Sequence, residues 1–173
     1  VPDIEKVEVP LKSIPEDLKS LRLVQITDLH VGPSIKRDYV QRVADKVNSI
    51  EPDIVAITGD LVDGTVKHLR EHVAPLKDIS ARYGTFFVTG NHEYYSGVDA
   101  WLDELNRLGF KILLNEHQII QHGEAKVLLA GVTDFKAHRF KIEHRTDPKA
   151  AMLNSPSQVD AKILMAHQPK NIF

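Results

Sequence analysis

The sequence has no cysteine, and this absence removes two kinds of structure at once. Disulfide bridges cannot form, and a metal site built on thiolates is excluded. The absence does not indicate a compartment, because reducing and oxidising environments both contain cysteine-free proteins. A metal site in this chain would therefore depend on imidazole, carboxylate and other oxygen ligands.

The chain also lacks a long apolar run and an excess of basic residues. No stretch approaches the roughly 20 apolar residues that a membrane helix needs, and no secretory signal pattern is present. Basic residues number 22 against 24 acidic ones, whereas a nucleic-acid-binding face would need a strongly basic surface. We therefore expect no nucleic-acid partner, and we rank a nuclease below an enzyme for small-molecule or lipid-linked substrates.

The length of 173 residues predicts one domain over residues 1–173, and a hydrophobic fraction of 42% is enough for a substantial core. The chain starts with Val1 instead of methionine, and it stops without a polar tail. We therefore expect that both ends are trimmed and that the domain lacks its C-terminal part.

Five short apolar runs predict strands that are buried on both faces, as in a sheet covered by helices. A further strand is predicted at 110–115, and a hairpin at 118–130 has its turn at 122–124. Residues 6–14 read as an edge strand, where Pro10 is tolerated. The five runs are 21–28, 53–60, 85–92, 126–134 and 162–169.

Helical periodicity appears between these runs. Apolar residues at helical spacing form one stripe in 37–50, in 66–80 and in 98–108, and Pro75 is expected to split the second segment. Residues 135–158 have weak periodicity and read as a loop or a short helix. Alternating strands and helices predict an α/β fold with βαβ crossovers.

Metal-ligating residue types follow most of the apolar runs. In an α/β sheet, ligands bind beyond the carboxyl ends of the strands, where these side chains would converge. Oxygen and imidazole groups suit divalent cations. The residues concerned are Asp28, His30, Asp60, Asp63, Asn91, His92, Asp134 and His167.

Several carboxylates at one cleft would repel each other and raise each other's pKa. One cation relieves this repulsion and two relieve it better, with Asp60 as the natural bridge. Two ions about 3.5–4 Å apart form the clamp used in phosphoryl displacement. Gly59 and Gly90 would allow the sharp turns and close backbone approach that such a site needs.

Four motifs resemble those of the calcineurin-like metallophosphoesterases. They are DLH (28–30), GDLVD (59–63), GNHE (90–93) and AHQP (166–169), and their order, spacing and strand context match the family from about residue 21 onward. The resemblance implies a mixed β-sandwich flanked by helices. The first motif and its surroundings are similar to a subgroup of membrane-associated or exported phosphodiesterases, related to those that cleave UDP-diacylglucosamine.

The resemblance also implies a ligand set for two divalent ions, chosen among Mn, Fe, Zn, Mg and Ni. Asp28 and His30 would bind the first ion, Asp60 would bridge both, and Asn91 and His167 would bind the second.

The resemblance assigns the chemistry to two further residues. His92 would act near the leaving oxygen, and Asp63 would orient it. The dinuclear site would activate water for in-line attack on a phosphomonoester or phosphodiester, either a small molecule or lipid-linked. Segments outside this chain would allow membrane association.

The family pattern includes a later GHxH motif, and none follows His167 here. We expect both metal sites of this chain to lack one ligand each, and its metal binding and activity to be weak. A scaffold protein on the same fold, without catalysis, is the alternative function, although such scaffolds usually have eroded ligands.

Structural explanations compete for single residues. Asp28, Asp60 and Asp63 are also common turn residues, and Asp134 has no motif partner and is read as structural. Glu93 is expected to shape its loop. The basic stretch 136–145 is read as a solvated face, with contact to a phosphate-bearing substrate or an acidic membrane as the alternative. The remaining histidines are expected in solvated positions: His68, His72, His117, His122, His138 and His144.

Overall fold

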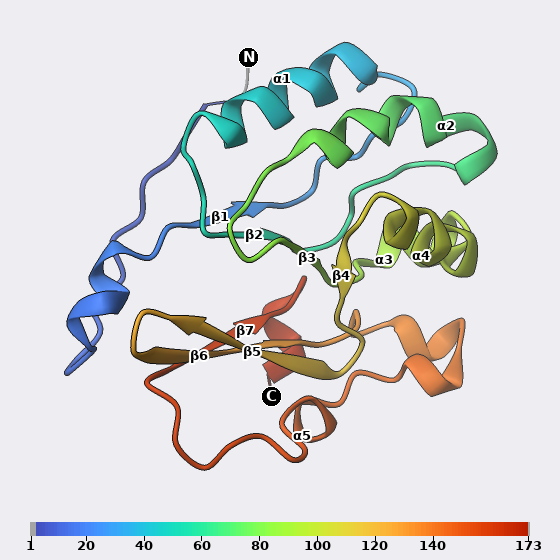
Figure 1. Ribbon diagram of the computed structural model, residues 1–173. Coiled ribbons are helices and arrows are strands. Elements are labelled where there is room, and N and C mark those ends of the chain that lie inside the picture. Colours follow the sequence, from blue (N-terminus) through green and yellow to red (C-terminus); the bar gives the residue numbers. More distant parts are fainter. Residues whose placement is uncertain (1–2, 173) are drawn as a thin grey trace.

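Two β-sheets stacked face to face form the centre of the structure, a computed structural model that describes residues 3–172 (Figure 1). The first sheet has four parallel strands in the order β1-β2-β3-β4, with Leu23 opposite Ile54 and Val55 opposite Thr85. Its strands are β1 (Leu23–Ile26), β2 (Ile54–Ile57), β3 (Thr85–Phe87) and β4 (Lys111–Ile112).

The second sheet has three strands in the order β5-β6-β7. Strands β5 (Glu116–His122) and β6 (Ala125–Gly131) form an antiparallel hairpin, and β7 (Ala161–Met165) pairs with β6 in parallel. Gly123, with a φ of +60°, lies in the two-residue turn of the hairpin, since His122 pairs with Ala125.

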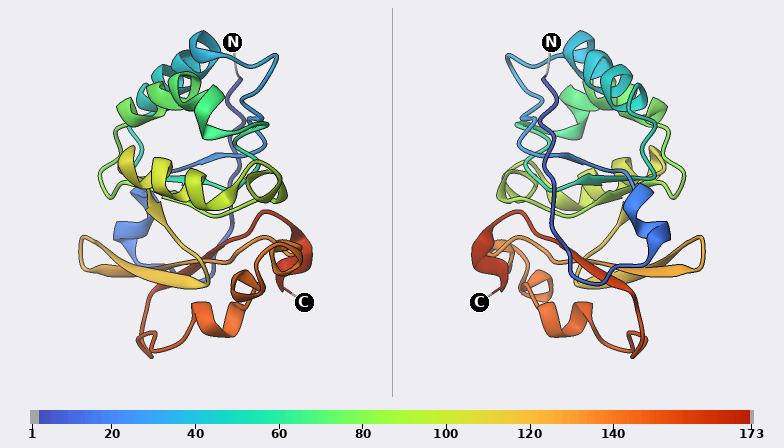
Figure 2. Two further views of the ribbon diagram at one scale, coloured as in Figure 1. Left: turned by 90° about the vertical axis from the view of Figure 1, so that its right-hand side faces the viewer. Right: turned by 90° about the vertical axis from the view of Figure 1, so that its left-hand side faces the viewer.

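Helices cover the outer face of the first sheet, and shorter turns cover the second (Figures 1 and 2). Helix α1 (Arg37–Asn48), helix α2 (Val66–Val73) and helix α4 (Val98–Arg107) each turn an apolar stripe inward. The short elements are η1 (Glu16–Ser20), η2 (Ala74–Asp78), α3 (Asn91–Tyr95), η3 (Ala137–Arg139), η4 (Ile142–His144), α5 (Pro148–Ala151) and η5 (Pro169–Ile172).

Two apolar cores share the middle strands of the first sheet. Successive side chains of a strand point to opposite faces, so β2 sends Val55 and Ile57 toward the helices and Ile54 and Ala56 toward the second sheet. The layer between the sheets also contains Phe86, Val88, Ile120, Val127, Leu129 and Met165. This layer holds the two sheets together and fixes how their strand ends meet.

The predicted α/β class and the helix-flanked β-sandwich are confirmed, and each of the five apolar runs contains a strand. The predicted split at Pro75 is also confirmed, because α2 ends at Val73 and η2 follows. Helix α3 was not predicted, since its five residues are too few to show a helical period.

Two expectations about strands are wrong. Strands β1 and β7 are not buried on both faces, because each is an outer strand of its sheet and exposes alternate residues. The edge strand predicted at 6–14 is absent: this segment pairs with no strand in the described part of the chain, and Val7 and Val9 are 74% and 69% exposed. Alternating valines without a neighbouring strand to cover them do not form a sheet.

Within residues 3–172, no helix combines the length and the apolar character needed to cross a membrane.

The close approach of Gly59 to Gly90 gives a stability prediction. A Cβ atom on Gly59 would lie 2.4 Å from the backbone nitrogen of Gly90, and its φ is +89°. Gly109 has nearly the same φ, +90°, but a Cβ there meets nothing within 4 Å. Replacing Gly109 with alanine should therefore lower the free energy of unfolding by about 1 kcal/mol, and Gly59→Ala by at least about 3 kcal/mol.

Urea unfolding of the two variants measures this difference. Equal losses of stability in Gly59→Ala and Gly109→Ala would mean that the backbone contact can relax without cost.

Candidate metal centre

The loops after β1 and β2 lie side by side and are joined by backbone hydrogen bonds. The amide of Asp28 donates to the carbonyl of Gly59 at 3.2 Å, and the amide of His30 donates to the carbonyl of Asp60 at 3.0 Å. Val31 then donates to Leu61 at 2.8 Å. Parallel pairing thus continues past the strand ends and brings the DLH and GDLVD motifs to one place.

Three candidate ligands in these loops have left-handed backbone conformations. The φ angles are +53° at Asp28, +47° at His30 and +50° at Asp60. Residues other than glycine rarely adopt such angles, and each costs on the order of 1–3 kcal/mol. Such conformations cluster at functional sites, where the surrounding structure holds them in place. These angles turn the chain sharply at the strand ends.

The carboxylate of Asp60 lies at the centre of the site and is only 5% exposed. Its Oδ2 atom lies 3.8 Å from Nε2 of His30, 3.8 Å from Nε2 of His92 and 3.3 Å from Nε2 of His167. Its Oδ1 atom accepts a hydrogen bond from the backbone amide of His92 at 2.9 Å. Three imidazoles from three separate loops therefore surround one carboxylate.

Two groups of possible ligands share Asp60. One group is His30, Asp60 and His92, and the other is Asp28, Asp60 and His167, with the ligand atoms of each group within 4.8 Å of one another. Atoms that bind one divalent ion at about 2.0–2.2 Å lie roughly 3–3.5 Å apart, so small movements would bring either group onto an ion. The donor set therefore fits divalent cations.

The grouping differs in detail from the one that the resemblance implies. Asp28 shares a group with His167, although its Oδ1 atom also lies 3.8 Å from Nε2 of His30. His92 lies in a group with His30. The ligand assignment therefore stays a prediction, and all the imidazoles and carboxylates that it names lie at this one place.

Asp63 holds two imidazoles at once. Its Oδ1 atom contacts Nδ1 of His30 at 3.0 Å and also Nδ1 of His92. The rings of His30 and His92 meet edge to face, with centroids 4.6 Å apart. A carboxylate on Nδ1 leaves Nε2 of each ring directed at Asp60. The orienting role of Asp63 stays a prediction, and this geometry adds His30 as a second histidine that Asp63 contacts.

His167 reaches the site from the second sheet, two residues after β7. Its Nδ1 donates to the backbone carbonyl of Thr58 at 2.9 Å, and this fixes the tautomer whose Nε2 faces Asp60. Burial lowers the pKa of His167, but the hydrogen bond to Asp60 and its charge outweigh burial and raise the pKa to about 9. Without a cation, a protonated His167 therefore pairs with ionised Asp60.

Two other groups of the cluster, Asp60 and His30, also have shifted pKa values. Burial raises the pKa of Asp60, but the hydrogen bonds from His167 and from the amide of His92 outweigh burial and hold it below its usual value. Burial also lowers the pKa of His30, and here the hydrogen bond and the charge of Asp63 outweigh burial and raise it. In the metal-free site, the surroundings of Asp60 and His30 therefore favour the charged forms of both groups.

Asn91 is connected to a buried carboxylate through a glutamine. Nε2 of Gln168 donates to Oδ1 of Asn91 at 3.2 Å and to Oδ2 of Asp134 at 3.1 Å. Asp134 is fully buried, and desolvation raises its pKa above the usual value. The structural interpretation of Asp134 is therefore supported, with the addition that it holds a neighbour of a candidate ligand.

Glu93 is fully buried and shapes the loops behind the site, as its position in the GNHE motif predicted. It accepts hydrogen bonds from the amides of Asp60 at 3.0 Å, Leu61 at 2.8 Å and Gly90 at 2.6 Å. Desolvation raises the pKa of Glu93, and the hydrogen bonds from Gly90 and Leu61 oppose this rise. Glu93 thereby ties the loop after β3 to the loop after β2.

One prediction about the other histidines is wrong. His122 is buried, not solvated, because its ring lies between the hydroxyl of Tyr83 at 3.0 Å and that of Ser20 at 3.4 Å. Its position at the end of β5, next to the turn of the hairpin, concealed this burial, since η1 is what covers it.

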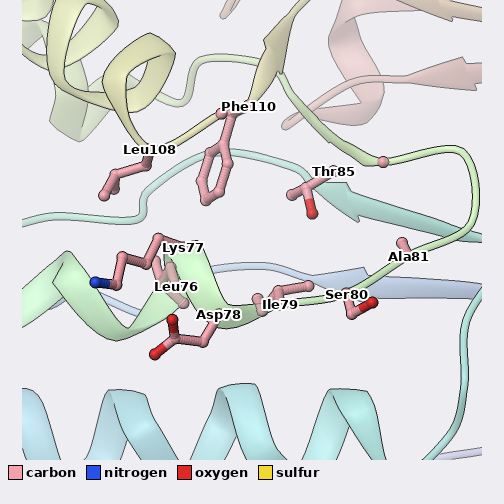
Figure 3. A pocket seen from close by; sticks show the side chains of 11 residues that line it. Leu76, Lys77, Asp78, Ile79, Ser80, Ala81, Thr85, Leu108 and Phe110 are labelled. Atoms are coloured by element: carbon pink, nitrogen blue, oxygen red, sulfur yellow. The ribbon is translucent and has the colours of Figure 1, made fainter.

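A separate hollow of about 490 Å³ is lined by residues other than the candidate ligands (Figure 3). Leu108 and Phe110 line it on one side, and Leu76 and Ile79 line it on the other. Thr85, which begins β3, is also in the lining, so the hollow is at the amino edge of the sheet. It contains none of the candidate ligands.

Comparisons with known proteins agree with this geometry. A profile of the family described as calcineurin-like phosphoesterase matches residues 21–172. A "Transmembrane protein with metallophosphoesterase domain" from Danio rerio is 38% identical over 173 residues, which cover 97% of this chain and 39% of that protein. A UDP-2,3-diacylglucosamine pyrophosphatase from Chlamydia trachomatis is 37% identical over 78 residues, which cover 44% of this chain and 24% of that protein.

The chain belongs to the calcineurin-like phosphoesterase family. It spans 39% of the length of the Danio rerio relative. Among solved structures, the NAD nucleotidase of Haemophilus influenzae shares the fold, with a TM-score of 0.64 at 19% identity over 88% of this chain and 35% of that chain.

The hydrogen bonds of Glu93 lead to a prediction with a matched control. Glu93→Gln places an amide NH2 against backbone N–H donors, so it should lower the free energy of unfolding by roughly 2–4 kcal/mol and weaken Mn²⁺ binding. Glu104 is equally buried but pairs with Arg70 and Arg107, away from the site. Glu104→Gln should therefore reduce stability without changing Mn²⁺ affinity.

Urea unfolding and Mn²⁺ titration calorimetry measure the two effects separately. The assignment fails if Glu93→Gln binds Mn²⁺ as tightly as the wild type.

The raised pKa of His167 predicts how the stability of the metal-free protein depends on pH. The pKa is about 9 in the folded state against a usual 6.5, so the stabilisation is complete below pH 6.5 and disappears as the pH rises to about 9. The loss should amount to roughly 3 kcal/mol.

The measurement is urea unfolding in chelator between pH 6 and pH 9.5. The stability difference between the wild type and His167→Gln should shrink over this range. A difference that stays constant would show that His167 and Asp60 are not paired.

Proposed function

We propose that this domain belongs to a metal-dependent phosphoesterase that uses two divalent ions to hydrolyse a phosphomonoester or phosphodiester. One observation carries the proposal: two groups of imidazole and carboxylate ligands share the buried carboxylate of Asp60. A shared carboxylate is the arrangement that holds two ions a few ångströms apart. Family membership supports the hydrolytic class of the reaction.

Each residue has a role that follows from its contacts. Asp28, His30 and His167 would hold the ions together with Asp60, and Asn91 lies beside them through its contact with Gln168. Bound divalent ions would supply Lewis acidity toward the phosphoryl oxygens and a lower pKa for water.

His92 is placed to handle charge on the leaving oxygen. Its side chain is 34% exposed, so one edge of the ring faces solvent and an incoming substrate. Asp63 holds its Nδ1, and the resulting orientation directs Nε2 toward the carboxylate of Asp60. An imidazole whose Nδ1 is held in this way can present an Nε2–H that donates to an ester oxygen.

The donor set, which is intact as far as His167, argues against the scaffold alternative. Scaffolds derived from such enzymes would have no need for two groups of ligands around one carboxylate, or for left-handed backbone angles at Asp28, His30 and Asp60.

The test uses the full-length protein with bis-p-nitrophenyl phosphate and p-nitrophenyl phosphate in the presence of Mn²⁺. Wild-type protein should bind about two ions per chain and hydrolyse at least one of the substrates. Asp60→Asn should lose both ions and at least roughly 1,000-fold of kcat/KM, because the bridge is removed.

His68→Asn is the control, since His68 lies on α2 and contacts Thr65 away from the site. It should keep both the metal content and the activity. Activity of Asp60→Asn at the wild-type level would refute the proposal.

A further inference from the structure

We propose that an apolar wall beside the candidate metal centre, made by Tyr95 and Phe140 and extended along the chain by Ile142, binds the aliphatic chain of an amphiphilic phosphoester. This inference rests on the proposed function, because it names the substrate class of the same site. The three side chains are 54%, 51% and 68% exposed, and exposed apolar groups that gather at one place mark binding surfaces.

The wall is continuous with the catalytic residues. The ring of His92 lies 5.3 Å from the ring of Tyr95, and the ring of Tyr95 lies 5.4 Å from that of Phe140, measured between centroids. Ile142 follows two residues later, at the start of η4. A substituent that extends from the phosphorus on the side of His92 therefore meets Tyr95 first and Phe140 next.

Packing underneath holds the wall in place. Tyr94 is buried together with Val98 and Ala137, which joins α3 and α4 to the segment that carries Phe140. The hydroxyl of Tyr94 also contacts Nδ1 of His144 at 3.0 Å. The orange segment lies directly below α3 and α4 in Figure 1, as these contacts require. The exposed side chains thus stand on a fixed base.

The ring geometry favours a chain over a nucleobase. A base binds best where two parallel faces leave a gap, but the rings here are in contact and tilted by 57° and 59°. No planar group can enter between them. An aliphatic chain needs only a continuous apolar surface to lie along, and this surface has that form.

The charges near the wall match an anionic amphiphile. The segment 135–145 carries four basic residues, Lys136, Arg139, Lys141 and Arg145, against the single carboxylate of Glu143. Lys141 is engaged by Asp99 and Glu143, whereas Arg139 and Arg145 are exposed. Exposed basic residues in the same segment as Phe140 and Ile142 suit a molecule with a phosphate head and an aliphatic tail.

The test compares alkyl p-nitrophenyl phosphodiesters with chains from methyl to decyl, below their micelle concentrations, on the full-length protein with Mn²⁺. Wild-type kcat/KM should rise at least tenfold from methyl to decyl. In the double variant Phe140→Ser with Ile142→Ser the rise should fall below threefold. Leu153→Ser is the matched control, because Leu153 is equally exposed at 68% and lies outside the wall, so the tenfold rise should remain.

Decyl phosphate binding, measured by calorimetry without turnover, separates this inference from the proposed function. The double variant should bind it at least fivefold more weakly than the wild type and Leu153→Ser, even if no ester is hydrolysed. A flat chain-length series, unchanged binding in the double variant, or a preference for thymidine 5′-p-nitrophenyl phosphate over the decyl ester would overturn the inference.

Discussion

The buried carboxylate of Asp60 is the group on which the site depends. It lies within 3.3–3.8 Å of three imidazoles, and a negative charge with so little exposure needs positive partners. In the metal-free protein a protonated His167 supplies this charge, and in the loaded protein cations would supply it. The same neighbours thus serve both states, so the pocket can keep its shape when an ion arrives.

Two glycines and one glutamate hold together the loops that carry the candidate ligands. Gly59 and Gly90 let the loops after β2 and β3 touch backbone to backbone, and Glu93 receives three amides that would otherwise be buried without partners. The left-handed angles of Asp28, His30 and Asp60 are held by the hydrogen bonds of their amides to Gly59, Asp60 and Glu93, respectively. The hydrogen bonds and backbone contacts of the surrounding loops therefore offset the backbone strain at these candidate ligands.

Much of this was predictable from the sequence, because the signals were local. Apolar runs marked the strands, and the polar residues after them marked the site, since parallel strands bring their carboxyl ends to one edge. The failures had non-local causes. Neighbours in space decide whether residues 6–14 pair with a strand, whether β1 is covered and whether His122 is buried. The double contact of Asp63 and the link from Asp134 to Asn91 likewise depend on side-chain positions across several loops.

The path of the chain through the two sheets has a consequence for biogenesis. Asp28 comes early in the sequence, and its partner His167 comes from the other sheet about 140 residues later. During synthesis, the helix-covered sheet can form before His167 is available to join the other candidate ligands. A cation held by Asp28, Asp60 and His167 would therefore bind only after β7 has docked, and its binding would report that β7 has joined the second sheet.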